Sequence, residues 1–380
     1  MYIQRLNNIQ DIINLKNEYY DKYHILPLNV SNWTVSDQFR NTIENTICID
    51  TQPSRIDYIY SYSIPETIHN KVIKKIGVPQ RCLDKVSSIF FPNNTIAIVN
   101  VCVYLKKINA KNVGILNPAY FSIAKCLETF DIQYHLYNIT RENDQYDICN
   151  GLLNNNIDVL WITSPIFSTG CYYTESNLNI IKKLLDKGVL VIADESFSIA
   201  GNELIRKFAD YHNFIGIYSP HKSLSINALK FSVVICNSNL EDFFEQWLDL
   251  YCGNLQQSTI AAIYHYLSDN FSICSQKINE YISNSKKETF NVIQKYNCIS
   301  YDIDTKGSMI TVYLKNKDLD KMQCLDYIRE VIENTLALYY PGSLNGFNPD
   351  MGFCFRINCA LYDADYIGTL NRLLNYICVH

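Results

Sequence analysis

Two reactive side chains, Asp194 and Lys222, stand just after apolar runs of the chain. The run Val189–Ala193 leads directly into Asp194, and the run Asn213–Ser219 precedes Lys222. A lysine amine forms a Schiff base with an aldehyde, and a carboxylate keeps a heterocyclic nitrogen protonated. Pyridoxal phosphate (PLP) chemistry needs both, because the protonated pyridine ring acts as an electron sink. The pair is common by itself, so the interpretation depends on the residues around it.

Short apolar runs alternate with helical patterns through the first two thirds of the chain. The predicted strands are Asn112–Leu116, Val159–Thr163, Val189–Ala193, Asn213–Ser219 and Phe231–Asn237, and the helices include Thr95–Ile108, Ser122–Phe130 and Glu175–Lys187. This alternation predicts an α/β fold with a mostly parallel, doubly wound sheet. In such sheets the ligand lies beyond the carboxyl ends of the strands, where Asn117, Ser164, Asp194 and Ser219 stand.

The pattern changes at about residue 266. A long polar helix is predicted at Ser275–Tyr296, and the predicted elements after it are Met309–Leu314, Leu325–Leu336, Gly352–Asn358 and Ala364–Tyr376. Their mixed order indicates a smaller α+β domain. We therefore predict a large domain over residues 46–265 and a small domain over 266–380, with an N-terminal segment, 1–45, that packs with the small domain.

Composition and charge exclude several classes of protein. The chain has 380 residues, of which 48% are hydrophobic, and a net charge of −5 without a basic block, so we expect no nucleic-acid partner. It has no apolar run of about 18 residues and no signal-peptide core, which favours a cytoplasmic protein without a membrane partner. The cysteines are scattered singly, without zinc-ligand spacing, so no metal site is predicted.

Further candidate residues follow one another along the chain. The segments are Asn93-Asn94-Thr95, Asn117-Pro-Ala-Tyr120, Ser164-Pro-Ile-Phe167-Ser-Thr-Gly170, Asp194-Glu-Ser-Phe197 and Ser219-Pro-His-Lys222, with Lys230 and Arg356 after them. In this order they resemble the fold-type I PLP-dependent enzymes of the class I/II aminotransferase group, which includes histidinol-phosphate aminotransferase. The resemblance extends from about Tyr60 to Arg356 and marks the chain as a divergent member.

The resemblance implies a role for each matching residue. Lys222 would carry the Schiff base, Asp194 would pair with the pyridine nitrogen, and the ring of Tyr120 would stack on the cofactor. Ser219 and Lys230 would bind the phosphate. Lys230 stands where the family usually has an arginine, so it would supply a point charge in place of a bidentate fork. For Lys222 and Lys230 the alternative is an ordinary surface charge, and for Asp194 it is a helix cap or a surface residue.

The segment Asn93-Asn94-Thr95 stands where the family has a glycine-containing turn that binds the phosphate at a helix N-terminus. Asparagine tolerates left-handed backbone geometry, so such a turn can form without glycine. The alternative is a plain asparagine helix cap. The resemblance also assigns Tyr60 to the phosphate of a neighbouring subunit's cofactor, which implies a homodimer.

Arg356 lies in Gly352-Phe-Cys-Phe-Arg356, an apolar strand. An arginine buried there is costly unless it is paired, and the resemblance implies that it binds the carboxylate of an amino-acid substrate through two hydrogen bonds. The alternative is a structural ion pair within the protein.

Two positions depart from the family pattern. Phe167 and Phe197 stand where relatives have an asparagine and a tyrosine that donate hydrogen bonds to the 3′-oxygen of PLP, so Ser164, Ser196 or a water would have to donate instead. The resemblance implies an aminotransferase of amino-acid metabolism or biosynthesis, acting on an amino acid or a derived intermediate. The two phenylalanines keep elimination, cyclisation or decarboxylation open, and a third reading is a non-catalytic binding protein.

Overall fold

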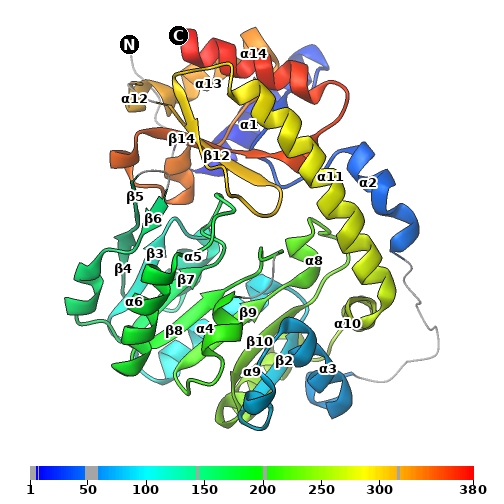
Figure 1. Ribbon diagram of the computed structural model, residues 1–380, viewed down its shortest axis with the longest axis vertical. Coiled ribbons are helices and arrows are strands. Elements are labelled where there is room, and N and C mark those ends of the chain that lie inside the picture. Colours follow the sequence, from blue (N-terminus) through cyan, green and yellow to red (C-terminus); the bar gives the residue numbers. More distant parts are fainter. Residues whose placement is uncertain (1–5, 7, 48–58, 143–144, 200–202, 315–316) are drawn as a thin grey trace.

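The computed structural model describes residues 6, 8–47, 59–142, 145–199, 203–314 and 317–380. Two lobes make up the molecule (Figure 1). The large lobe is built on a seven-stranded sheet, and the small lobe on a three-stranded sheet.

The large sheet has the strand order β2-β10-β9-β8-β7-β3-β4. Its strands are β2 (Val86–Phe91), β3 (Val113–Asn117), β4 (Tyr134–Asn138), β7 (Val159–Thr163), β8 (Leu190–Asp194), β9 (Phe214–Tyr218) and β10 (Ser232–Asn237). Neighbours are parallel except at β10, which runs antiparallel to both β2 and β9. Every residue of β3, β7, β8 and β9 is buried, which explains their continuous apolar runs. The predicted mostly parallel α/β fold is confirmed.

Helices connect and cover these strands. They are α3 (Glu66–Ile76), α4 (Asn94–Lys107), α5 (Phe121–Thr129), α6 (Glu175–Asp186), α7 (Glu203–Phe208), α8 (Pro220–Ser223), α9 (Glu241–Cys252) and α10 (Gln257–Leu267). Helix α4 packs against β2, β9 and β10, and most of its side chains are buried. The N-terminus of α4 therefore lies close to the strand ends. A small hairpin, β5 (Thr140–Glu142) and β6 (Gln145–Asp147), follows the edge strand β4.

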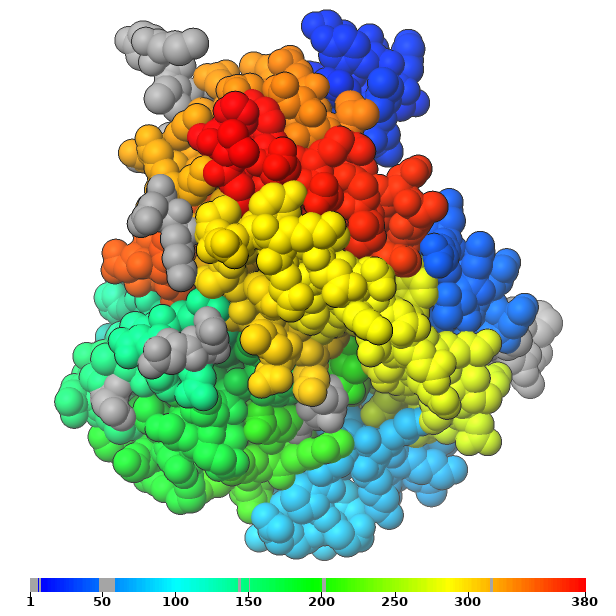
Figure 2. Space-filling model, turned by 45° about the horizontal axis from the view of Figure 1, so that its top comes forward, coloured from blue at the N-terminus to red at the C-terminus, as the bar shows by residue number. Residues whose placement is uncertain are grey.

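Helix α11 (Asp269–Ile293) runs from the large lobe up to the small lobe (Figure 1). The small sheet is antiparallel, in the order β11 (Ile299–Tyr301), β12 (Met309–Leu314) and β14 (Phe353–Asn358). Around it are α1 (Ile9–Tyr23), α12 (Leu319–Met322), α13 (Leu325–Thr335) and α14 (Tyr366–Val379), and β1 (Leu28–Asn29) pairs with β13 (Ala337–Leu338). In the space-filling view the yellow and orange residues after α11 rest on the green part of the large lobe (Figure 2).

Two hydrophobic cores correspond to the two sheets. Ile12 and Leu15 of α1 belong to the core of the small lobe, whereas Phe39 and Ile43 of α2 (Asp37–Ile43) pack into the core of the large lobe. The domain limits at residues 45 and 265 stay predictions. In the described residues, no helix is both long enough and apolar enough to cross a membrane.

Candidate active site

The strand directions bring the predicted residues to one edge of the large sheet. The parallel strands β7, β8 and β9 end at this edge, so Ser164, Asp194 and Ser219 lie on neighbouring strands. Strand β2 runs parallel to β9, because both are antiparallel to β10, and Asn93 follows its end. Strand β10 begins at the same edge, which places Lys230 there as well.

A pocket of about 430 Å³ opens at this edge. Its lining residues are Trp33, Asn93, Asn94, Thr95, Tyr120, Phe197, Ser219, Lys222, Asn227 and Lys230. The structure thus brings together most of the residues that the sequence singled out. Trp33 and Asn227 were not foreseen, because they stand in loops without a recognisable motif.

Asp194 ends strand β8 and is only 2% exposed. Its carboxylate accepts hydrogen bonds from Asn94 Nδ2 at 3.1 Å and from the backbone N–H of Ser196 at 3.0 Å. Among the described residues, no ion pair includes Asp194. A buried carboxylate is costly without a cationic partner, so this one fits a protonated ring nitrogen. The bond from Asn94 was not predicted, since nothing in the sequence links these residues.

Lys222 lies in the short helix α8. Its Nζ is 4.7 Å from the ring centre of Tyr120 and 4.5 Å from that of Phe197. Burial lowers the pKa of this amine, and Lys230 lowers it further, whereas Asp194 opposes the shift. A lower pKa raises the fraction of neutral amine at physiological pH, which is the form that attacks an aldehyde.

The N-terminus of α4 forms one side of the pocket. Asn93 caps this helix, because its side chain accepts from the backbone N–H of Ile96 at 3.1 Å. Of the two alternatives left open by the sequence, the structure has the asparagine cap: Asn93 has φ −164°, and the positive φ values in the described residues do not include Asn94 or Thr95. An extended cap followed directly by the helix needs no left-handed residue. The first N–H groups of a helix have no intrahelical partner, and such a helix N-terminus is suited to an anion.

Two further groups suited to an anion lie beside α4. Ser219 is buried, and its hydroxyl is hydrogen-bonded to that of Ser232. Lys230 lines the same pocket, and its charge acts on Lys222. Among the residues that the structure describes, neither lysine takes part in an ion pair. A cation without an ion-pair partner beside a helix N-terminus fits a phosphate.

Arg356 lies on β14 and is 1% exposed. Its Nε donates to the carbonyl oxygen of Ser31 at 2.8 Å, and one terminal nitrogen donates to Ser168 Oγ at 3.1 Å and to Asn345 Oδ1 at 3.3 Å. The other terminal nitrogen has no partner among the described residues. The structural ion pair considered as the alternative is also absent there. Arg356 is a buried cation with an open donor.

Trp33 separates Arg356 from the pocket. The guanidinium carbon of Arg356 is 3.8 Å from the ring centre of Trp33, and the ring of Trp33 stacks on Phe197 at 4.8 Å and 22°. Trp33 also lines a second, narrow cavity together with Phe167 and Lys222. The indole of Trp33 therefore contacts the guanidinium of Arg356 and also lines the pocket of Lys222.

The two departures from the family pattern form an apolar wall. Phe167 is 2% exposed, and its ring lies 5.9 Å from Tyr120 and 6.3 Å from Phe197. The hydroxyl oxygens of Ser164 and Ser196 are buried and have no hydrogen-bond partner among the described residues. These are the two serines expected to replace the missing donors, and that role stays a prediction.

Tyr60 is not among the pocket residues. Its ring stacks on Tyr62, with 5.0 Å between the ring centres. Its assigned role at a neighbouring subunit stays a prediction. Within the described part of the chain, no cluster of three or more His, Cys, Asp or Glu residues could hold a metal ion.

Comparisons with known proteins place this geometry in context. The sequence matches no protein-family model and no curated protein. Among solved structures, an alanine aminotransferase from Pyrococcus furiosus is similar with a TM-score of 0.79 and 14% identity, over 98% of this chain and 97% of that chain. A Pyrococcus horikoshii kynurenine aminotransferase, solved in complex with PMP, gives 0.77 and 12%, over 96% and 94%.

A multiple substrate aminotransferase from Thermococcus profundus gives a TM-score of 0.76 and 10% identity, over 99% of this chain and 94% of that chain. At such identities the likeness concerns the fold. The fold implied by the sequence is confirmed: this chain has the fold of the PLP-dependent aminotransferases.

Proposed function

We propose that the protein is a PLP-dependent enzyme that acts on an amino acid or an amino-acid-derived intermediate, with aminotransferase as the best-supported activity. One observation carries this proposal: Asp194 and Lys222 lie at the ends of neighbouring strands, next to a pocket that also holds a helix N-terminus and Lys230. PLP fits the residues present, because the buried carboxylate of Asp194 suits its ring nitrogen, the amine of Lys222 suits its aldehyde, and Lys230 with the N-terminus of α4 suits its phosphate. The fold shared with aminotransferases supports it.

When bound, PLP would supply an aldehyde for the amine and a ring that accepts electrons. Lys222 would hold the cofactor covalently and, once released by the substrate amine, would take the proton from the substrate α-carbon as general base. Asp194 would keep the ring nitrogen protonated. Tyr120 would stack on the ring, and Ser219, Lys230 and the N-terminus of α4 would bind the phosphate.

Arg356 would bind the α-carboxylate of the substrate. Burial lowers the pKa of its guanidinium to about 9, opposed by the nearby Tyr340, so it keeps its charge at neutral pH. A carboxylate is the partner that satisfies an unused donor of a buried arginine. Trp33 would then exclude water from this contact, because its ring covers the guanidinium.

Phe167 and Phe197 favour a second candidate, namely elimination, cyclisation or decarboxylation on the same scaffold. Apolar rings at both positions remove the usual hydrogen-bond donors to the 3′-oxygen, so the ionised form of this oxygen would be less stabilised. Formation of a keto acid that depends on an added amino acceptor would separate transamination from these reactions.

Three further features belong to the same proposal. We infer a homodimer, in which Tyr60 would reach the cofactor of the partner. We also infer a cytoplasmic location and a role in amino-acid metabolism or biosynthesis. These inferences come from the fold and its resemblance, and sedimentation of the purified protein tests the first of them.

The test is covalent trapping. Purified protein is mixed with PLP, reduced with borohydride and digested, and the peptides are mapped by mass spectrometry. We expect the pyridoxyl group on Lys222 and loss of the absorbance band in Lys222→Ala. The modification should not move to Lys230 in that variant. Absence of the adduct, or an adduct on another lysine of the wild type, would overturn the proposal. A panel of amino acids, followed by spectra and product mass, then identifies the substrate.

A further inference from the structure

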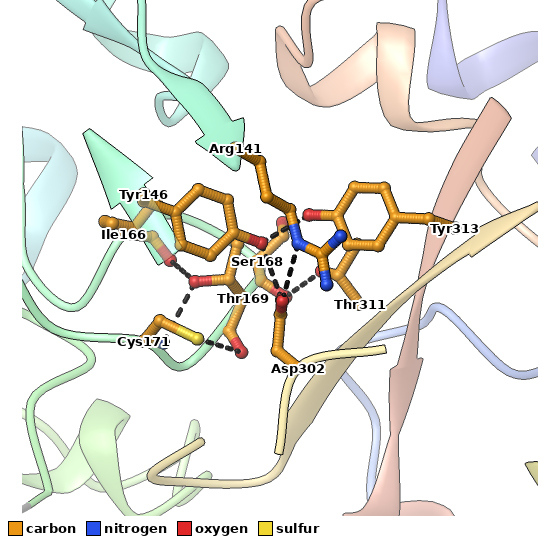
Figure 3. Close-up of polar contacts among 9 residues, drawn as sticks. All are labelled: Arg141, Tyr146, Ile166, Ser168, Thr169, Cys171, Asp302, Thr311 and Tyr313. Carbon is orange, nitrogen blue, oxygen red and sulfur yellow. Dashed lines mark hydrogen bonds and ion pairs between the residues drawn. The ribbon is translucent and has the colours of Figure 1, made fainter. Parts of the chain in front are cut away.

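A buried polar cluster around Arg141 and Asp302 joins the two lobes (Figure 3). Arg141 Nε donates to Asp302 Oδ1 at 2.9 Å, and these side chains are only 10% and 1% exposed. The hydroxyl of Tyr146 donates to Asp302 Oδ2 at 2.6 Å and is also hydrogen-bonded to the hydroxyl of Tyr313. The guanidinium carbon of Arg141 lies 4.1 Å from the ring centre of Tyr313. None of these residues has a part in the chemistry proposed above.

The members of this cluster come from both lobes. Arg141 and Tyr146 lie on the β5–β6 hairpin of the large lobe. Asp302 follows β11, and Tyr313 lies on β12, so both belong to the small lobe. The ion pair therefore connects a hairpin of one lobe with the sheet of the other.

One face of the small sheet carries both this cluster and Arg356. Residues 311 and 313 of β12 point to the same face, because side chains alternate along a strand. Thr311 pairs with Arg356 across the ladder, and Tyr313 pairs with Cys354. Tyr313 and Cys354 belong to the core of the large lobe. The opposite face, with Val312, Phe353 and Phe355, packs into the core of the small lobe.

Two side chains on the same face donate hydrogen bonds to Ser168, in the turn that follows β7. Thr311 Oγ1 donates to the carbonyl oxygen of Ser168 at 2.9 Å, and Arg356 donates to Ser168 Oγ at 3.1 Å. Next to Ser168, Gly170 has φ +74°, and a Cβ there would come within 2.5 Å of the carbonyl oxygen of Lys306. The turn around Ser168 and the β5–β6 hairpin are thus two of the places where the small lobe contacts the large lobe.

We propose that Arg141 and Asp302 are positioning residues for the substrate carboxylate site: their ion pair, shared with Tyr146 and Tyr313, holds β12 against the large lobe and so keeps Arg356 at a fixed place relative to Lys222. With the ion pair lost, β12 would be held less tightly to the β5–β6 hairpin, and the small lobe could shift on its remaining contacts with the large lobe. Arg356 would then move, whereas the PLP-binding residues, which lie on the large lobe, would not. This inference rests on the proposed role of Arg356.

The test uses the full chain with PLP bound and two variants. Asp302→Asn removes the charge, and Tyr146→Phe removes a single hydroxyl and is the milder change in case the first variant does not fold. Arg329→Gln is the control, because Arg329 forms only exposed ion pairs, with Glu18 and Asp326. Three quantities are measured: KM and kcat for the amino acid that the wild type consumes, the Kd for PLP, and hydrogen exchange of the backbone in residues 164–173.

We expect both variants to raise KM by about tenfold, since small misplacements of a binding group are costly, with kcat and the Kd for PLP changed less than twofold. Exchange in residues 164–173 should become faster, and the control should match the wild type. An unchanged KM in a folded variant, even one of lower stability, would reduce the cluster to a structural role and overturn the inference. If the wild type consumes no amino acid, the proposed function fails, and unchanged exchange would still overturn the inference.

Discussion

Replacement of Arg356 by methionine separates a binding arginine from a structural one. Arg356 is buried, has no acidic partner among the described residues, and lies under the ring of Trp33. Methionine has a similar reach and no charge, and its thioether makes favourable contacts with aromatic rings, worth about 0.3–1.5 kcal/mol. The substitution therefore removes the charge and keeps much of the packing.

The stability effects of this change partly cancel. Burial lowers the pKa of Arg356 from its ordinary value to about 9, and at about 1.36 kcal/mol per pKa unit a shift of this size disfavours the charged form by about 5 kcal/mol. Against this stand the hydrogen bonds to Ser31, Ser168 and Asn345. Hydrogen bonds of a charged donor contribute about 1.5–3 kcal/mol each. Three such bonds contribute about 4.5–9 kcal/mol, so we expect Arg356→Met to lower the free energy of unfolding by about 2 kcal/mol, and by no more than about 4 kcal/mol.

Substrate binding should respond very differently. Loss of one partner from a buried carboxylate–guanidinium contact costs about 2–5 kcal/mol, which is a loss of affinity of about 30-fold or more. The assay is urea unfolding of wild type and variant, together with spectral titration of the PLP-bound protein with amino acids. Arg356→Lys is a second variant, because it keeps the charge and loses the bidentate geometry.

Arg141→Met is the matched control for stability. Arg141 is also a largely buried arginine, but it pairs with Asp302, and its removal leaves that carboxylate uncompensated, at a cost of about 3–5 kcal/mol. If Arg356→Met destabilised the protein as much as Arg141→Met, or left amino-acid affinity unchanged, Arg356 would be a structural residue and the reasoning would be refuted.

Three other predictions concern single residues, namely Lys222, His221 and Gly170. Because burial lowers the pKa of Lys222, the rate at which the free protein captures PLP, monitored by stopped-flow absorbance, should rise with pH around a midpoint below 10.5. A midpoint at or above that value would contradict the lowered pKa. Burial, reinforced by His265, lowers the pKa of His221 to about 3. As the pH falls, His221 is protonated in the unfolded state before it is protonated in the folded state, so stability is lost as the pH falls from about 6.5 towards 3. That loss amounts to about 2 kcal/mol at pH 5, and urea unfolding of His221→Asn should show a weaker dependence. Gly170→Ala should lower the free energy of unfolding, measured in urea, by more than about 3 kcal/mol, because it adds backbone strain and a clash with the carbonyl oxygen of Lys306. Gly188→Ala should lower it by only about 1–2 kcal/mol, because Gly188 has φ +87° and no atom within 4 Å of the added Cβ. Equal losses would show that the contact between Gly170 and Lys306 is loose.

Local patterns were sufficient to predict five of the seven strands of the large sheet and the residues at its edge. The strands β7, β8 and β9 are buried on both faces, so they appear as apolar runs, and the residues after them must lie at one edge because the strands are parallel. Asp194, Ser219 and Lys222 were placed by this rule. Strands β2 and β4 were missed, since β2 contains Ser87 and Ser88 and β4 is a largely exposed edge strand.

Long-range contacts were decided by the tertiary structure alone. The ring of Trp33 over Arg356, the bond from Asn94 to Asp194 and the ion pair between Arg141 and Asp302 each join segments that are far apart in the chain. The physical reason is that periodicity reports which side of an element is buried, whereas desolvation and hydrogen bonding depend on which other segment covers it. The sequence determined which residues could do chemistry, and only the packing of the two lobes decided which of them are held together.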